Sequence, residues 1–275
     1  MREPRQLAGI ALLFLLTITP LGKSQDAPPD PSQGPPTTQS PGVSPALTAG
    51  ERPISWKQLV PNIIQDQKPI WLFPVHAAQG KHLLPTAAFI LTTAGLVALD
   101  PHTAPYFRRT NSFADFNRTF SGGRTALGTA LVPLAFYGVS LARQDTHGQR
   151  TTLYIAEAVA DAEILTTVMK NVDRRLRPSD IPPYGDYSHT WFKGTGPVLR
   201  GPGGFPSGHT IAAFSVATVF AHRYRKHRWV PYVAYGLAGF VGFTRISNQS
   251  HFVSDVFAGA ALGYVIAHNV TLRQP

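Results

Sequence analysis

The sequence predicts an all-α protein, a bundle of six or so core helices. Apolar residues recur at spacings of three and four, the period of one helical face, and long uncharged apolar runs recur along the chain. The alternation typical of β-strands is nowhere sustained. Of 275 residues, 43% are hydrophobic, which is enough for a sizeable core.

The N-terminal segment, residues 1–24, predicts a secretory signal peptide. Arg2 and Arg5 precede an apolar run over 7–18, and Gly22 and Ser24 are small residues at a cleavage triplet. An uncleaved anchor helix is the alternative, but the run is shorter than the roughly 20 residues that span a membrane. We therefore expect an exported protein, periplasmic or extracytoplasmic.

Residues 25–53 predict a disordered linker. The segment is rich in Pro, Ser, Thr and Gly and carries few large apolar side chains, so it cannot bury enough surface to offset its ordering entropy. We expect one folded domain over residues 54–275.

The expected helices follow from apolar periodicity within that domain. The first shows the pattern clearly, with Trp56, Leu59 and Ile63 on one face, and the second should end where Pro follows Asp100. Glycine and proline residues mark most of the other ends. The expected helices cover residues 55–67, 85–99, 125–143, 151–172, 210–224, 230–245 and 252–269.

The sequence leaves the relation to a membrane open. The apolar runs 85–99, 125–142 and 229–244 are short for a hydrocarbon core about 30 Å thick. The 151–172 helix carries Glu157 and Asp161, which are costly in lipid, and mean hydropathy is −0.04. We expect a soluble or surface-bound bundle, with an integral membrane bundle as the alternative.

Net charge and cysteine content limit the kinds of binding partner and chemistry that the chain can have. A net charge of +10 favours anionic partners such as phosphorylated substrates or an anionic lipid surface, although solubility alone is the simpler interpretation. The absence of cysteine excludes disulfides, a thiolate nucleophile and cysteine-ligated zinc. No nucleic-acid recognition element is visible, and no metal cofactor is expected.

A basic segment, residues 170–178, carries the first chemical signal. Lys170 and Arg177 are seven residues apart, so a helix continuing to Pro178 would present both on one face. Two such cations can hold a phosphate, and arginine can do so with two parallel hydrogen bonds. A solvated basic helix end is the alternative.

A glycine-rich turn, residues 203–209, carries the second. Glycines before a helix allow backbone N–H groups to approach an anion, and Ser207 can donate its hydroxyl. His209, at the first helical turn, can transfer a proton near neutral pH. Simple helix capping by Ser207 is the alternative.

The third signal lies in residues 244–255. His251 and Asp255 are four apart, so on a helix a carboxylate would orient the imidazole and raise its basicity. Arg245 ends the preceding helix and adds another cation. A surface His–Asp pair of little consequence is the alternative.

Together the three segments resemble the type 2 phosphatidic acid phosphatase (PAP2) family, which shares its fold with vanadium haloperoxidases and bacterial class A acid phosphatases. The family pattern is Lys, six residues, Arg-Pro; then Pro-Ser-Gly-His; then Ser-Arg, five residues, His, three residues, Asp. Thr244 stands where the family has serine and keeps the hydroxyl. The matching residues are Lys170, Arg177, Pro178, Pro206, Ser207, Gly208, His209, Arg245, His251 and Asp255.

The resemblance implies a phosphoric ester hydrolase that works through a phosphohistidine without a metal. His251 is then the nucleophile, Asp255 its orienting carboxylate, and His209 the acid that protonates the leaving group. The implied phosphate-binding groups are Lys170, Arg177, Ser207, Gly208 and Arg245.

Two alternatives remain. A vanadium-dependent haloperoxidase would bind vanadate on His251, and vanadate is also expected to mimic phosphate in a phosphatase; halide oxidation distinguishes the two. A non-catalytic binder of anionic lipid would scatter its cations rather than gather them around two histidines.

The substrate remains open among phosphatidic acid, isoprenoid pyrophosphates, lipid A phosphates and small phosphoesters. Residues 179–204, which include Tyr184, Trp191 and Phe192, are expected to form the rim of the pocket. The sequence does not indicate an oligomeric state.

Overall fold

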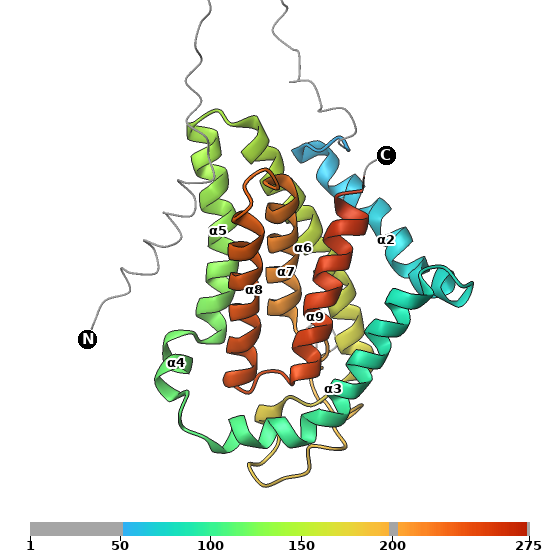
Figure 1. The fold of residues 1–275 in the computed structure, drawn as a ribbon, viewed down its shortest axis with the longest axis vertical. Coiled ribbons are helices and arrows are strands. Elements are labelled where there is room, and N and C mark those ends of the chain that lie inside the picture. The colour runs from blue at the N-terminus through green and yellow to red at the C-terminus, as the bar shows by residue number, and fades with distance from the viewer. Residues whose placement is uncertain (1–51, 198–202, 274–275) are drawn as a thin grey trace, which may run out of the picture.

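The computed structural model describes residues 52–197 and 203–273, and throughout those ranges the regular structure is helical (Figure 1). The all-α prediction is therefore confirmed. The predicted signal peptide and nearly all of the predicted linker lie outside the described residues. The elements are α2 (Trp56–Ala78), α3 (Leu83–Arg109), α4 (Ala114–Thr119), α5 (Gly122–Ala142), α6 (Thr146–Asp173), η1 (Pro178–Asp180), α7 (Gly208–Arg223), α8 (Val230–Ser247), α9 (Val253–Ile266) and η3 (Ala267–Thr271).

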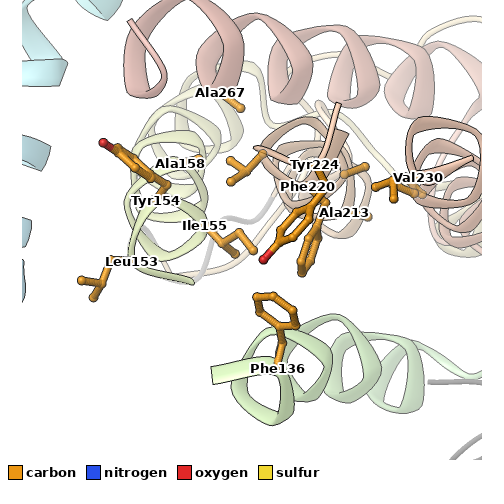
Figure 2. Close-up of a cluster of buried hydrophobic side chains, with 14 of the residues drawn as sticks. Phe136, Leu153, Tyr154, Ile155, Ala158, Ala213, Phe220, Tyr224, Val230 and Ala267 are labelled. Atoms are coloured by element: carbon orange, nitrogen blue, oxygen red, sulfur yellow. The ribbon is translucent and has the colours of Figure 1, made fainter. Parts of the chain in front are cut away.

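Helix α7 forms the centre of the bundle and packs against α5, α6, α8 and α9 (Figure 1). The largest apolar cluster lies on its flank, where the Phe136 and Phe220 rings meet edge to face at 5.1 Å and Ile155 and Val230 are buried (Figure 2). On another side α9 approaches very closely, because a methyl group added to Gly263 would lie 2.4 Å from the Ile211 carbonyl oxygen. These contacts fix the N-terminus of α7, where the glycine-rich turn ends.

Helix α3 differs most from its prediction. It continues through Pro101 and Pro105 to Arg109 instead of ending at Asp100. A proline inside a helix removes one backbone hydrogen bond, and here side-chain bonds hold the same turn in place. Asp100 is fully buried and accepts from the Ser254 backbone N–H at 3.3 Å and from Arg175 at 2.7 Å.

The other boundaries also shift. Helix α2 runs eleven residues past the predicted end at Gln67, to Ala78, through Pro69 and Pro74. The short helix α4 was not predicted. Two acidic residues of α6 have partners on and before α2. Glu157 pairs with Arg52 at 3.2 Å, and Asp161 accepts from Gln67 at 2.9 Å.

Within residues 52–197 and 203–273, three helices are long and apolar enough to cross a membrane: α3, α5, and the segment from Val253 to Thr271. Only 6% of the apolar window of α3 is buried inside the protein, so exposed leucines cover its surface. The costly charges of α6 do not oppose a lipid environment, because Glu157 and Asp161 are fully buried and face α2. These exposed apolar faces associate the chain with a membrane.

Candidate active site

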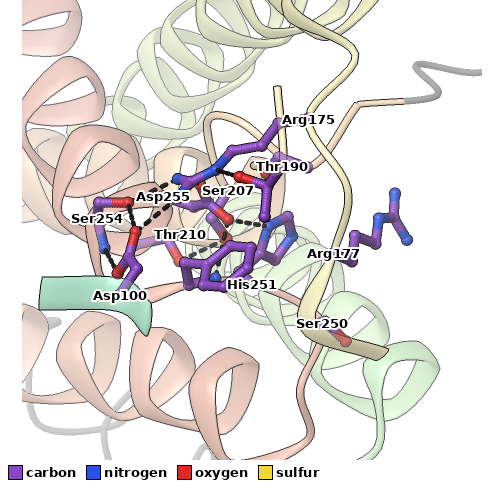
Figure 3. Close-up of polar contacts among 12 residues, drawn as sticks. Asp100, Arg175, Arg177, Thr190, Ser207, Thr210, Ser250, His251, Ser254 and Asp255 are labelled. Carbon is purple, nitrogen blue, oxygen red and sulfur yellow. Dashed lines mark hydrogen bonds and ion pairs between the residues drawn. The ribbon is translucent and has the colours of Figure 1, made fainter. Parts of the chain in front are cut away.

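The three chemical segments meet at one end of the bundle. They arrive from the end of α6, the N-terminus of α7 and the turn between α8 and α9, while the 179–197 stretch covers the same end (Figures 1 and 3). The site is therefore built by the bundle, and its members come from positions up to 85 residues apart in sequence (Lys170 to Asp255).

His251 lies in the turn before α9 and is 4% exposed. Its Nδ1 is 2.7 Å from the Gly204 carbonyl oxygen. A carbonyl only accepts, so Nδ1 carries the hydrogen and Nε2 keeps its lone pair. Burial lowers the pKa of His251, Asp255 raises it, and Lys170 and Arg177 lower it. The structure thus favours a neutral imidazole with a free Nε2.

Asp255 is fully buried in the first turn of α9. The expected helical His–Asp pair is wrong in one respect, because α9 begins at Val253 and His251 precedes it. Asp255 Oδ2 accepts from the Phe252 backbone N–H at 2.8 Å and lies 3.6 Å from His251 Nδ1. Its Oδ1 is 2.5 Å from Arg175 Nη1. The carboxylate therefore bonds to Arg175 directly and to His251 at longer range.

Lys170 and Arg177 do not share a helical face, which corrects the prediction. Helix α6 ends at Asp173, and Arg174 adopts a positive φ of 42°. The chain then pairs with the rim stretch, since Leu176 N donates to the Thr190 carbonyl at 2.8 Å. Both cations nevertheless lie near enough to His251 to lower its pKa. Burial lowers the pKa of Lys170 itself.

The glycine-rich turn brings backbone and lysine close together. Helix α7 begins at Gly208, directly after Ser207. A methyl group added to Gly208 would lie 3.1 Å from Lys170 Nζ, so glycine leaves the room that the lysine needs. The Ser207 hydroxyl accepts from Thr210 at 2.9 Å and can still donate.

His209 points toward the N-terminus of α5. Its Nε2 lies 3.2 Å from the Gly122 carbonyl oxygen. Burial, followed by the nearby Arg245 guanidinium, lowers its pKa to about 4. His209 is therefore neutral near pH 7, and an acid role requires that a bound anion offset the surrounding cations.

Arg245 is 1% exposed and held from two sides. Its Nη2 donates to the Thr125 hydroxyl at 2.5 Å and to the Thr244 hydroxyl at 2.8 Å. Thr244 therefore uses the hydroxyl that it shares with the family's serine. Burial lowers the pKa of Arg245 to about 10, so it remains a cation at neutral pH. Its Nη1 lies 3.0 Å from where a methyl group on Gly122 would be.

Sequence reasoning missed three contributors. Asp100 and Arg175 form buried ion pairs beside Asp255, and the N-terminus of α5 supplies contacts to Arg245 and His209. Gly122 and Gly123 precede an apolar helix just as Gly203 and Gly204 do. This similarity between the two glycine pairs could have indicated that the N-terminus of α5 belongs to the site. Nothing in the sequence indicated the ion pairs of Arg175.

The rim divides into packed and exposed aromatic side chains. Tyr184 is 84% exposed with the Arg109 guanidinium 4.7 Å from its ring, and Phe192 is 75% exposed. Tyr187 is buried, and Trp191 is half-buried with its ring 4.5 Å from the Arg175 guanidinium. Beside His251, a small hollow is lined mainly by apolar residues of α3, η1 and the α8–α9 turn, among them Ala104, Phe107, Ile246 and Phe252.

Across residues 52–197 and 203–273, no group of three or more His, Asp or Glu side chains is placed to hold a metal ion.

Comparison with known proteins finds similarity to one family over part of the chain. Residues 151–274 match the family model described as the PAP2 superfamily. Lipid A 1-phosphatase of Rhizobium etli is 31% identical over 110 residues, 40% of this chain and 44% of that protein. Lipid A 4'-phosphatase of Porphyromonas gingivalis is 30% identical over 108 residues, 39% of this chain and 44% of that protein.

One further relative has a higher identity over a shorter stretch of the chain. Lipid A 1-phosphatase of Porphyromonas gingivalis is 43% identical over 63 residues, 22% of this chain and 14% of that protein. The matches span less than half the length of these curated relatives. Among solved structures, the first transmembrane PAP2 type phosphatidylglycerolphosphate phosphatase from Bacillus subtilis aligns with a TM-score of 0.40 and 22% identity, covering 76% of this chain and 94% of that chain.

Proposed function

We propose that the chain, whose residues 151–274 match the PAP2 superfamily, is a metal-independent phosphatase that hydrolyses a lipid phosphate through a phosphohistidine on His251. The observation that carries the proposal is the clustering of a buried and a half-buried imidazole, His251 and His209, with three cations at one end of the bundle. Besides burial, Lys170 and Arg177 lower the pKa of His251. Besides burial, Arg245, His251 and Lys170 lower the pKa of His209.

The proposed reaction has two steps. Nε2 of His251 attacks phosphorus while the bond to the leaving oxygen breaks, and His209 donates a proton to that oxygen. His209 then takes a proton from water, whose oxygen attacks phosphorus, and the N–P bond breaks to release phosphate. Lys170, Arg177 and Arg245 offset the charge on the equatorial oxygens, a role that depends on positioned cations.

A lipid substrate fits the surroundings of the site. The long helices α3 and α5 and the Val253–Thr271 segment expose broad apolar faces. A lipid in the same bilayer would present its phosphate at this end of the bundle. The curated relatives are lipid A 1- and 4'-phosphatases, so lipid A phosphates are the first substrates to test.

The finer localisation is also a proposal. We infer that α3, α5 and the Val253–Thr271 segment cross the membrane and that the N-terminal signal exports the catalytic end to the periplasmic side. The apolar length of the three helices supports the first part. The charged start and short apolar run of residues 1–24 support the second.

Phosphate release from a substrate panel tests the function. The panel holds lipid A, phosphatidic acid, an isoprenoid pyrophosphate and a small soluble phosphoester, each in detergent with EDTA present. We expect turnover with EDTA, faster on a lipid than on the soluble ester, and an acid-labile phosphoenzyme after rapid quenching. The phosphoenzyme should be absent from His251→Gln.

Three outcomes would contradict the proposal in different ways. Turnover that EDTA abolishes argues against the metal-independent step, and preference for the soluble ester argues against a lipid substrate. Halide oxidation with added vanadate, in a protein that releases no phosphate, would favour the haloperoxidase alternative.

Anion binding should be coupled to proton uptake by His209. Burial and nearby cations, Arg245 first among them, lower its pKa to about 4. A dianion bound beside these cations should raise that pKa. A group whose pKa rises on binding strengthens binding below the new pKa, so affinity should grow as pH falls, by up to about tenfold per unit for that proton. Sulfate stays a dianion from pH 5 to 8, and its dissociation constant can be measured by calorimetry at constant ionic strength.

His209→Asn is the control for this measurement. The affinity of this variant for sulfate should change less with pH, because one proton fewer is taken up for each sulfate bound. Identical pH dependence in the two proteins would show that His209 takes up no proton when the anion binds.

A further inference from the structure

Glu163 is an acidic residue of α6 that the proposed reaction does not use. It precedes Lys170 by seven residues, and α6 is continuous from Thr146 to Asp173. Seven residues are close to two full turns of an α-helix, so the two side chains project from the same face. A carboxylate and an ammonium group therefore lie along one side of α6.

The start of α7 lies against both of these side chains. A methyl group added to Gly208 would lie 3.1 Å from Lys170 Nζ, and 3.6 Å from Glu163 Oε1. Gly208 is the first residue of α7 and one of the proposed phosphate-binding residues. The half-buried carboxylate of Glu163 therefore borders the proposed phosphate site on the side where Lys170 enters it.

Lys170 is the proposed phosphate-binding cation whose charge is most easily lost. Lysine has a lower ordinary pKa than arginine, and burial favours its neutral form. Burial is the main cause that lowers the pKa of Lys170, and the nearby Arg177 lowers it further. A neutral amine could no longer offset the charge of a phosphate oxygen.

Glu163 opposes this loss of charge more than any other carboxylate does. It raises the pKa of Lys170 more than Asp255 and Asp173, which act in the same direction. The interaction is reciprocal, because burial raises the pKa of Glu163 and Lys170 lowers it. The attraction acts across the space beside Gly208 and not through a direct ion pair.

We propose that Glu163 is a positioning residue that acts through Lys170, keeping the ammonium group charged beside Gly208 so that it can bind phosphate. The proposal rests on the proposed function, because Lys170 binds phosphate only in that reaction. The same carboxylate must repel a bound phosphate. Its role is therefore favourable only where Lys170 would otherwise lose its proton.

Other charged groups near Lys170 belong to the same electrostatic network. Each either changes the pKa of Lys170 or has its own pKa lowered by the ammonium group, and the variants below leave all of them in place. These groups are Asp173 from α6, Arg177 before η1, His209 from α7, His251 before α9 and Asp255 from α9.

The titration of the Lys170 amine measures the effect directly. Acetic anhydride acetylates only the unprotonated amine, so the labelling rate at each pH, followed by mass spectrometry, gives the pKa of Lys170 in the full chain. Glu163→Gln removes the negative charge and keeps the size of the side chain. The pKa of Lys170 should then fall by about one pH unit, the size expected when a nearby opposite charge is lost.

Two variants and one internal standard control this measurement. Glu163→Asp keeps the carboxylate one methylene group farther back, so it should lower the pKa of Lys170 by a smaller amount. Asp115→Asn makes the same change in net charge on α4, where the side chain is 92% exposed, and should leave Lys170 unchanged. Lys226, which is exposed in the turn between α7 and α8, should label identically in all the proteins.

Sulfate binding at different pH values separates this role from a purely structural one. At a pH where Lys170 is charged in wild type but neutral in Glu163→Gln, the variant should bind sulfate more weakly. At lower pH, where Lys170 is charged in both, the variant should bind sulfate at least as tightly, because the repelling carboxylate is gone. A structural defect would weaken binding at every pH.

The outcomes are distinct once thermal unfolding shows which variants fold. A pKa of Lys170 that falls in Glu163→Gln, falls less in Glu163→Asp and stays in Asp115→Asn supports the proposal. An unchanged pKa in the folded Glu163 variants, an equal fall in Asp115→Asn, weaker sulfate binding at every pH, or failure of both Glu163 variants to fold overturns it. Labelling needs no turnover, so the expected titration in a protein that releases no phosphate would overturn the proposed function and not the effect of Glu163 on Lys170.

Discussion

Replacing His251 with glutamine should lower kcat/KM by on the order of 10⁴-fold or more, the scale seen when a catalytic nucleophile is removed. His251 is the buried imidazole whose Nε2 is free while its Nδ1 bonds to Gly204. Glutamine can still donate to that carbonyl but cannot form the N–P bond. The cations around the site remain, so substrate binding should change far less than turnover.

The matched control is His102→Gln. His102 lies on α3 near the same end of the bundle, is exposed and has no motif around it. Phosphate release by this variant should stay within about twofold of wild type, as expected for an exposed side chain outside the reaction. Comparable turnover by His251→Gln and wild type would remove His251 as the nucleophile.

The residues proposed for the chemistry could be selected from the sequence because their spacing is a local property of it. Lys170, His209 and His251 fall in three short segments, and the structure brings the segments to one end of the bundle. The long helices of the described residues were predictable in number and approximate place because apolar periodicity reports burial on one face. These predictions needed no knowledge of how the helices pack.

What failed were features that long-range contacts decide. The prolines of α3 predicted a helix end, but Asp100 is held by Ser254 and Arg175, which are 154 and 75 residues away. Helix α6 ends at Asp173 because the next residues bond to the rim instead of to the helix. A propensity rule cannot weigh contacts that arise only after folding.

The membrane expectation failed to distinguish the alternatives for a related reason. Glu157 and Asp161 counted as charges that oppose a lipid environment, yet both are fully buried against α2. A charged side chain opposes a lipid environment only if it faces outward from the bundle. Apolar periodicity alone did not show whether these two side chains face inward or outward.

Replacing Arg245 with methionine should lower kcat/KM by about 10²- to 10³-fold, the cost of removing one group that stabilises transition-state charge. Arg245 is a fixed cation, since it is 1% exposed and bonded to Thr125 and Thr244. Its Nη1 points toward Gly122, whose carbonyl oxygen contacts His209. Methionine fills similar space without charge, so the loss should appear mainly in turnover.

Thr125→Val separates charge from orientation. It removes the 2.5 Å bond to Nη2, while Thr244 and the Phe120 carbonyl at 3.3 Å still hold the guanidinium. Its kcat/KM should fall less than about tenfold, because one hydrogen bond with alternative partners contributes little. Arg245→Lys should lie between the two variants, since lysine keeps the charge but loses the planar fork. Equal losses in Arg245→Met and Thr125→Val would mean that the position of the guanidinium, and not its charge alone, limits the reaction.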